Sequence, residues 1–217
     1  MPFSSTTETT TETTTESTTK KPDDNSSTTL PKYEVVKKVP APGSHKVATA
    51  SIGVTGDILI HNDVLKAALT SAGNYDFNPM LSTVAPYYKK YNKMIANLEV
   101  TLGGAEKGYS SYPMFNTPDS MADAVKYSGI DTVLFANNHT YDTGFFGMKR
   151  TLDVVRNLGL ETNGSRKSLD EPRYVVKDLN GIKVGMVSFT YETTSATQTR
   201  KYLNGLLLSE EAAPLVN

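Results

Sequence analysis

The sequence predicts an α/β fold, in which helices cover a largely parallel sheet in a layered structure. Two observations lead to this prediction. From about residue 47 to residue 163, short apolar runs alternate with amphipathic helical patterns, which is typical of parallel strands joined by right-handed helical crossovers. Asn180-Gly181 then separates two further strand-like runs, and this dipeptide is among the strongest signals for an antiparallel hairpin.

The first 46 residues are predicted to form a separate segment. Residues 1–31 consist mostly of Thr, Ser and Glu, and Leu30 is their only aliphatic side chain after Met1. Such a composition buries too little apolar surface to offset the entropy lost on ordering. We therefore expect a disordered Thr/Ser-rich stalk or linker over residues 1–46, with a featureless tail as the alternative. The folded domain is expected over residues 47–217.

Composition excludes several classes of protein and site. A net charge of −1 without a dense Lys/Arg cluster argues against nucleic acid as a partner. The absence of cysteine excludes disulfides and thiolate ligands, so a metal would be held by His, Asp, Glu or Asn. The sequence has neither a membrane-spanning apolar run nor the basic-then-apolar pattern of a signal peptide. For an exported protein, the signal or anchor would lie outside this chain.

The first part of the folded region reads as two strands with helices between them. The first strand alternates and leads into a Gly-Asp turn, and apolar residues at helical spacing follow an Asn-Asp pair that can cap a helix. Pro86 falls inside the second helical pattern and argues against its continuity. The predicted elements are strands at 47–54 and 94–100, and helices at 62–69 and 79–91.

The second part begins with a long glycine- and tyrosine-rich loop at 101–117, a length that indicates a functional or mobile loop. Pro118 is expected at the first helical position, and Ser128-Gly129 ends the same helix. The predicted elements after it are a strand at 132–135, a helix at 147–158, a short strand at 160–164, the hairpin at 173–192 and a short helix at 206–213.

Polar side chains follow three of the predicted strands. Asp57 comes after the first strand, Asn97 and Glu99 end the second, and Asn138-His139 follow the third. Because ligands of open α/β sheets bind at the carboxyl ends of strands, these groups are expected to meet in one crevice. Carboxylate, amide and imidazole ligands together suit Mn²⁺, Mg²⁺, Fe²⁺ or Zn²⁺.

His139 has two possible roles at such a site. It could act as a general acid towards a leaving group, or it could complete the coordination of the metal. Asp142, three residues later, could orient its ring. Each residue also has a purely structural explanation: Asp57 could cap a turn, Glu99 could be a solvated strand end, and His139 could bond a backbone carbonyl. Their recurrence at three strand ends favours a site.

The motifs that carry these residues resemble one known family. Gly56-Asp57-Ile58-Leu59, Asn97-Leu98-Glu99, and Ala136-Asn137-Asn138-His139-Thr140 with Asp142 and Gly144 occur in this order. They resemble the CapA/PgsA family of bacterial capsule and poly-γ-glutamate synthesis proteins. Asn180-Gly181-Ile182-Lys183-Val184-Gly185 matches the hairpin that this family carries next. The resemblance covers roughly residues 47–191.

The resemblance implies a fold of the calcineurin-like metallophosphatase type, an α/β/β/α sandwich with a site at its strand ends. It assigns Asp57, Glu99 and Asn138 to the metal, and His139 to catalysis with Asp142 beside it. The amides of Asn97 and Asn137 are expected to contact substrate. The cofactor would be a divalent metal ion.

The resemblance also implies a setting in the cell. Family members are attached to the cell envelope or extracellular, which suits a Thr/Ser-rich stalk. The expected partners are an anionic polymer such as poly-γ-glutamate and the membrane-bound subunits of a capsule synthase. Later His-Trp-Gly and Gly-His-x-His-like motifs of the family do not occur in this sequence. We therefore expect the amino-terminal part of the sandwich only, and whether it is an active metal-dependent hydrolase or phosphoesterase stays open.

A non-enzymatic function is the alternative. The domain would then keep the fold and act as a polymer-binding or scaffold subunit of the synthase complex.

Overall fold

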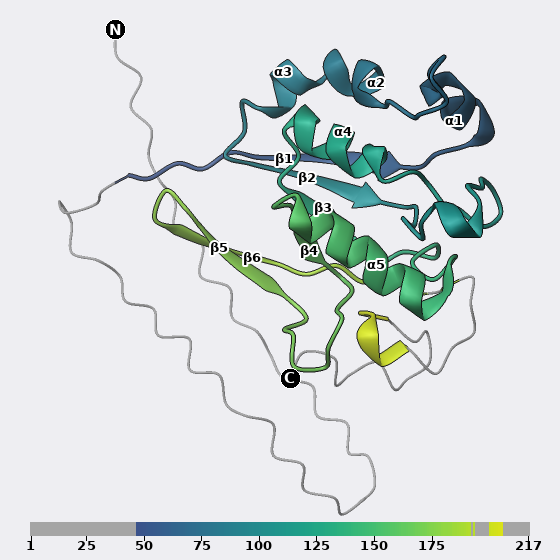
Figure 1. Ribbon diagram of the computed structural model, residues 1–217. Helices are drawn as coiled ribbons and strands as arrows, with labels where there is room; N and C mark the ends of the chain where they lie inside the picture. The colour runs from purple at the N-terminus through teal and green to yellow at the C-terminus, as the bar shows by residue number, and fades with distance from the viewer. Residues whose placement is uncertain (1–46, 192, 194–199, 206–217) are drawn as a thin grey trace, which may run out of the picture. The chain divides into compact units, whose positions relative to one another are not determined.

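A computed structural model describes residues 47–191, 193 and 200–205, and these residues form one α/β unit (Figure 1). The predicted stalk at 1–46 and the predicted helix at 206–213 lie outside the described residues. No helix within the described ranges is long and apolar enough to cross a membrane.

The centre of the unit is a four-stranded parallel sheet in the order β1-β2-β3-β4. The prediction of an α/β fold with a parallel sheet is therefore confirmed. Each strand pairs with the next along the chain, which brings the carboxyl ends of all four to one edge. The strands are β1 (Ile52–Ile58), β2 (Lys93–Leu98), β3 (Thr132–Leu134) and β4 (Glu161–Asn163).

Helices connect the strands and cover one face of the sheet, because sequential parallel strands with right-handed crossovers place their connections on the same side. Met94, Ala96 and Leu98 alternate along β2 and are buried in a core that also holds Val125 of α4 and Leu152 of α5. The helices are α1 (Asn62–Ala68), α2 (Asn78–Ser82), α3 (Ala85–Tyr88), α4 (Ser120–Ser128) and α5 (Gly144–Asn157), with 3-10 turns η1 (Ala105–Lys107) and η2 (Arg200–Tyr202).

Several boundaries differ from the sequence prediction. The expected helix at 79–91 is two short helices, because Pro86 cannot donate to the carbonyl four residues earlier and instead occupies the first turn of α3. The Asn62-Asp63 pair was expected to cap α1, but His61 occupies the N-cap position and both residues lie in the first turn of the helix. Pro118 precedes α4 instead of opening it. Gly129 ends α4 in the left-handed conformation, as predicted.

The predicted hairpin is present as β5 (Val175–Leu179) and β6 (Ile182–Met186), paired antiparallel. Asn180 and Gly181 both have positive φ, at 57° and 87°, which a two-residue turn of the type I′ class requires. Lys177 of the hairpin forms an ion pair with Glu161 of β4. Glu161 also bonds Lys93 of β2 at 2.8 Å. The hairpin is thus attached to the face of the sheet opposite the core helices.

The side chain of Asn116 forms three hydrogen bonds within the long loop at 101–117. Asn116 is 2 % exposed, and its Oδ1 accepts a hydrogen bond from Gly103 N at 2.7 Å. Its Nδ2 donates to the carbonyls of Gly104 at 2.9 Å and Gly108 at 2.7 Å. This side chain supplies hydrogen-bond partners to three backbone groups of the loop, as a neighbouring strand would do in a sheet, and so fixes the conformation of the loop.

Replacing Asn116 with Ala is expected to lower the free energy of unfolding by about 2–4 kcal/mol, because three backbone groups lose their partner inside the loop. Urea denaturation followed by circular dichroism measures the change. Ser110→Ala is the matched control in the same loop, since it removes one exposed hydrogen bond, and a change within about 0.5 kcal/mol is expected. An equal effect of the two variants would contradict the role given to Asn116.

Candidate functional site

Two carboxylates lie at the carboxyl ends of β1 and β2 and share one amide. Asn97 Nδ2 donates to Asp57 Oδ1 at 2.8 Å and to Glu99 Oε2 at 3.0 Å. Asp57 and Asn97 are register partners, and a shift in the pairing between Val54 and Asp57 precedes them. Asp57 therefore lies inside β1, not after it as predicted, because the strand begins at Ile52 and extends further than expected.

The closeness of these carboxylates affects their protonation. The pKa of Glu99 is raised above its ordinary value, first by burial and then by the charge of Asp57 and a hydrogen bond with it. The charge of His139 and the hydrogen bond from Asn97 act in the opposite direction. Burial and the neighbouring charge of Asp57 both disfavour the ionised form of Glu99, so a positive charge beside the pair would be stabilising.

A second amide connects β3 to this pair. Asn137 Nδ2 donates to Asn97 Oδ1 at 3.1 Å and to the carbonyl of Leu98 at 2.8 Å. Asn137 Oδ1 accepts from the backbone N–H of His139 at 3.1 Å, and Thr140 closes the turn with a 2.9 Å bond to the Asn137 carbonyl. Both amides are thus occupied within the protein, and their contact with substrate stays a prediction.

His139 and Asp142 form the second half of the site. His139 Nδ1 lies 2.8 Å from Asp142 Oδ2, and both residues are buried. The same carboxylate oxygen accepts from Phe115 N at 2.7 Å. An acceptor at Nδ1 places the ring proton there in the neutral imidazole and leaves Nε2 as the reactive nitrogen.

Aromatic contacts link the long loop to this histidine. The ring of Phe115 meets His139 edge to face, with centroids 4.7 Å apart. His61 packs on the same Phe115 at 5.4 Å and on the exposed Tyr112 at 6.4 Å. His61 is exposed, yet it lies close to the site through its contact with Phe115. No sequence pattern indicated Phe115, because its contact with His139 joins residues far apart in the chain.

The structure thus brings six of the seven predicted site residues into one hydrogen-bonded network: Asp57, Asn97, Glu99, Asn137, His139 and Asp142. Asn138 is exposed beside it. No group of three or more His, Asp or Glu side chains in the described part of the chain is placed to hold a metal. The available donor set is two repelling carboxylates with neighbouring amide oxygens. These hard oxygen donors fit a divalent ion that takes further ligands from elsewhere.

Comparison with known proteins identifies the family. The family model described as "Bacterial capsule synthesis protein PGA_cap" matches residues 51–214. The chain belongs to this capsule synthesis family. The matched region contains every predicted site residue, so the resemblance expected from the motifs is confirmed.

The chain is also similar to a characterised relative, "Capsule biosynthesis protein CapA" of Bacillus anthracis, with 24% identity over 170 residues. The alignment covers 76% of this chain and 40% of the relative. This capsule synthesis family member therefore spans less than half the length of that relative.

Replacing Glu99 with Gln is expected to raise the melting temperature at neutral pH and to have less effect in acid. A raised pKa means that the folded state holds the proton more tightly, so this stabilising contribution is present in acid and is lost as pH rises through the raised pKa. Gln carries no charge at any pH, so the stability of Glu99→Gln relative to wild type increases as pH rises through the raised pKa. Thermal melts with a chelator from about pH 4 to about pH 8 measure it.

Glu106→Gln, at an exposed carboxylate of η1, is the control for removing one negative charge. A difference between Glu99→Gln and wild type that is constant with pH would contradict the raised pKa of Glu99.

Proposed function

We propose that this family member serves the synthesis, export or anchoring of an anionic polymer of the bacterial envelope, such as poly-γ-glutamate, through a metal-dependent hydrolytic or transfer site. The observation that carries the proposal is the joining of the Asp57–Asn97–Glu99 cluster to the His139–Asp142 pair at one sheet edge. The family match and the capsule biosynthesis name of the Bacillus anthracis relative support the biological setting.

The metal would be held by Asp57 and Glu99, with Asn138 as a third ligand from the exposed end of the loop after β3. A bound divalent ion lowers the pKa of its water and polarises the oxygen of an ester or amide. In this proposal, Asn97 holds the two carboxylates at one position by donating to both. The raised pKa of Glu99, caused by burial and then by Asp57, supports a site that gains stability from a cation.

His139 would handle the proton of the leaving group. Asp142 accepts from Nδ1, so Nε2 is the nitrogen that exchanges a proton with substrate. Phe115 N fixes Asp142, and the Phe115 ring limits the rotation of the imidazole. Burial of His139 keeps bulk water away from the donated proton.

A second candidate is a polymer-binding or scaffold subunit of a synthase complex at the envelope. The observation that favours it is a pocket with three arginines beside the carboxyl end of β4, which can hold an anionic chain without any chemistry.

Manganese is expected to raise the melting temperature of the wild-type chain, because a ligand at one hundred times its Kd stabilises the folded state by about 2.7 kcal/mol. Asp57→Asn is expected to remove most of that shift, and elemental analysis of both proteins gives the metal content. Asp63→Asn is the control, since this carboxylate is solvent-exposed on α1. An equal manganese shift in wild type and Asp57→Asn would place the metal elsewhere.

Replacing His139 with Gln is expected to reduce hydrolysis of a polyglutamate or phosphodiester substrate by about 10²–10⁴-fold, the usual contribution of a general acid. The manganese-dependent melting shift should persist, because the carboxylates remain. Initial rates with added manganese test this. Equal turnover by wild type and His139→Gln would show that His139 takes no part in the chemistry. Binding of the polyglutamate by wild type without any turnover would favour the scaffold function.

A further inference from the structure

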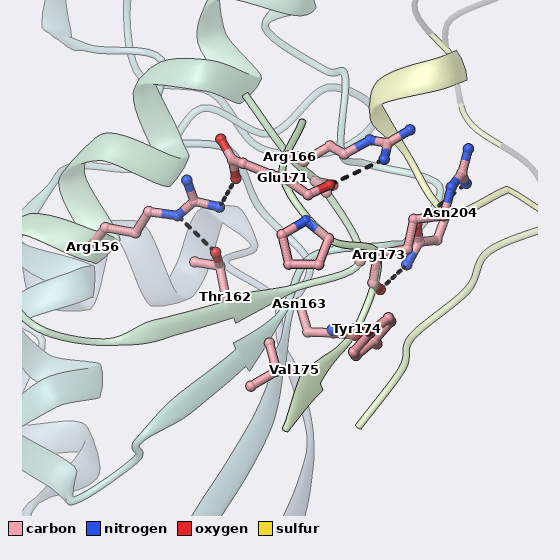
Figure 2. Close-up of a pocket in the computed structure, with 12 residues that line it drawn as sticks. Arg156, Thr162, Asn163, Arg166, Glu171, Arg173, Tyr174, Val175 and Asn204 are labelled. Carbon is pink, nitrogen blue, oxygen red and sulfur yellow. Dashed lines mark hydrogen bonds and ion pairs between the residues drawn. The ribbon is translucent and has the colours of Figure 1, made fainter. Parts of the chain in front are cut away.

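A small pocket adjoins the candidate site at the same edge of the sheet. It lies beside the carboxyl end of β4 and has a volume of about 90 Å³, which is room for several water molecules. Figure 2 shows Arg156 and Thr162 on one side of it and Arg166 and Asn204 on the other. A carboxylate or another group of that size fits the space.

The pocket has an excess of positive charge. Arg156 is neutralised by Glu171 at 2.8 Å. Although burial raises the pKa of Glu171, the hydrogen bond and charge of Arg156 outweigh it and hold this pKa below its ordinary value, so Glu171 stays ionised. Arg166 and Arg173 form no ion pair with another described residue. Arg166 and Arg173 therefore line the pocket without an ion-pair partner among the described residues, although the charge of Glu171 also acts on Arg166.

The two uncompensated arginines differ in how they are held. Arg166 donates to the carbonyls of Lys201 at 2.6 Å and Glu171 at 3.2 Å. Burial and then the charge of Arg173 lower the pKa of Arg166, whereas the charges of Glu171 and Tyr202 act in the opposite direction. Arg173 makes a single side-chain hydrogen bond within the described ranges, to Asn204 Oδ1 at 3.4 Å. Its other donors bond no residue in the described part of the chain, so they can serve a ligand.

One acceptor in the pocket has no partner. Asn163 is 3 % exposed, and its Oδ1 receives no hydrogen bond from any described residue. Its Nδ2 donates to the carbonyl of Met186 at 3.3 Å, which fixes the orientation of the amide. A buried unsatisfied acceptor is unfavourable unless a ligand or water supplies a donor. A ligand that satisfies both Arg173 and Asn163 carries an anionic oxygen together with an N–H.

We propose that this pocket binds a carboxylate carried next to an amide N–H, the repeating chemistry of an acidic peptide-like polymer. Arg173 donates to the carboxylate, Arg166 adds its charge, and Asn163 Oδ1 accepts from the amide. A phosphate ion offers the negative charge but lacks the amide donor. The inference deepens the proposed function and rests on it for the substrate class, an anionic polymer.

The pocket touches the loop that carries the site. Ser165 Oγ donates to the carbonyl of Phe135, directly before the Asn137–His139 turn. Gly164 packs so closely on this segment that a Cβ there would lie 2.5 Å from the Cβ of Ala136, and its φ is +103°. Residues of the pocket and of the site are thus neighbours across β3 and β4, and one polymer chain can occupy both.

The test is calorimetric binding of a γ-linked glutamate trimer to the full 217-residue chain in a buffer with EDTA, so that metal binding does not contribute. Wild type is expected to bind the trimer more tightly than inorganic phosphate. Arg173→Gln is expected to weaken binding about tenfold or more, since a hydrogen bond to a charged group contributes about 1.5–3 kcal/mol. Lys183→Gln, on β6, removes the same charge outside the pocket and should change Kd less than about twofold.

Three results would overturn the inference: no binding of the trimer to wild type, equal weakening by Arg173→Gln and Lys183→Gln, or phosphate binding as tight as that of the trimer. Melting temperatures confirm that each variant is folded. Because EDTA is present, failure of the metal-dependent function leaves the trimer result unchanged. Conversely, trimer binding that does not depend on Arg173 would leave the results of the manganese and His139 experiments unaffected.

Discussion

The arrangement of the site depends on one amide, the side chain of Asn97. Its two N–H groups reach Asp57 and Glu99, and its oxygen accepts from Asn137. These bonds form only if β1, β2 and β3 are adjacent and parallel with their carboxyl ends together, which is the observed order. The amide holds the two carboxylates close without neutralising them. Their repulsion therefore remains. Burial is the largest cause of the raised pKa of Glu99, and the charge of Asp57 is the next.

The His139–Asp142 half of the site depends instead on the long loop. Asp142 is oriented by Phe115 N, and Phe115 also packs on His139. Asn116, the next residue, ties the loop to its own beginning through Gly103 and Gly104. The loop was expected to be functional or mobile, and its hydrogen bonds favour a fixed, functional role.

Much of the fold could be predicted because its signals are local: strand–helix alternation, the Asn180-Gly181 turn and the glycine end of α4. The strand-end residues followed from the same pattern. Phe115 could not be predicted, because its contacts join a loop to a turn 24 residues later. The role of Asn137 was missed for a similar reason: which of two consecutive amides faces the neighbouring strand depends on the exact backbone turn after β3. Pro86 was recognised as a conflict, and the helix is split there because proline has no backbone N–H to donate.

The two ends of this sheet edge carry opposite charge. Asp57 and Glu99 stand at the ends of β1 and β2, whereas Arg166 and Arg173 stand beyond β4. An anionic polymer is attracted to the arginines and repelled by the bare carboxylates. A divalent ion on Asp57 and Glu99 would reverse the repulsion, so the same polymer would extend from the pocket to His139. Under the proposed function, the metal would decide whether a bound chain reaches His139, in addition to supplying chemistry there.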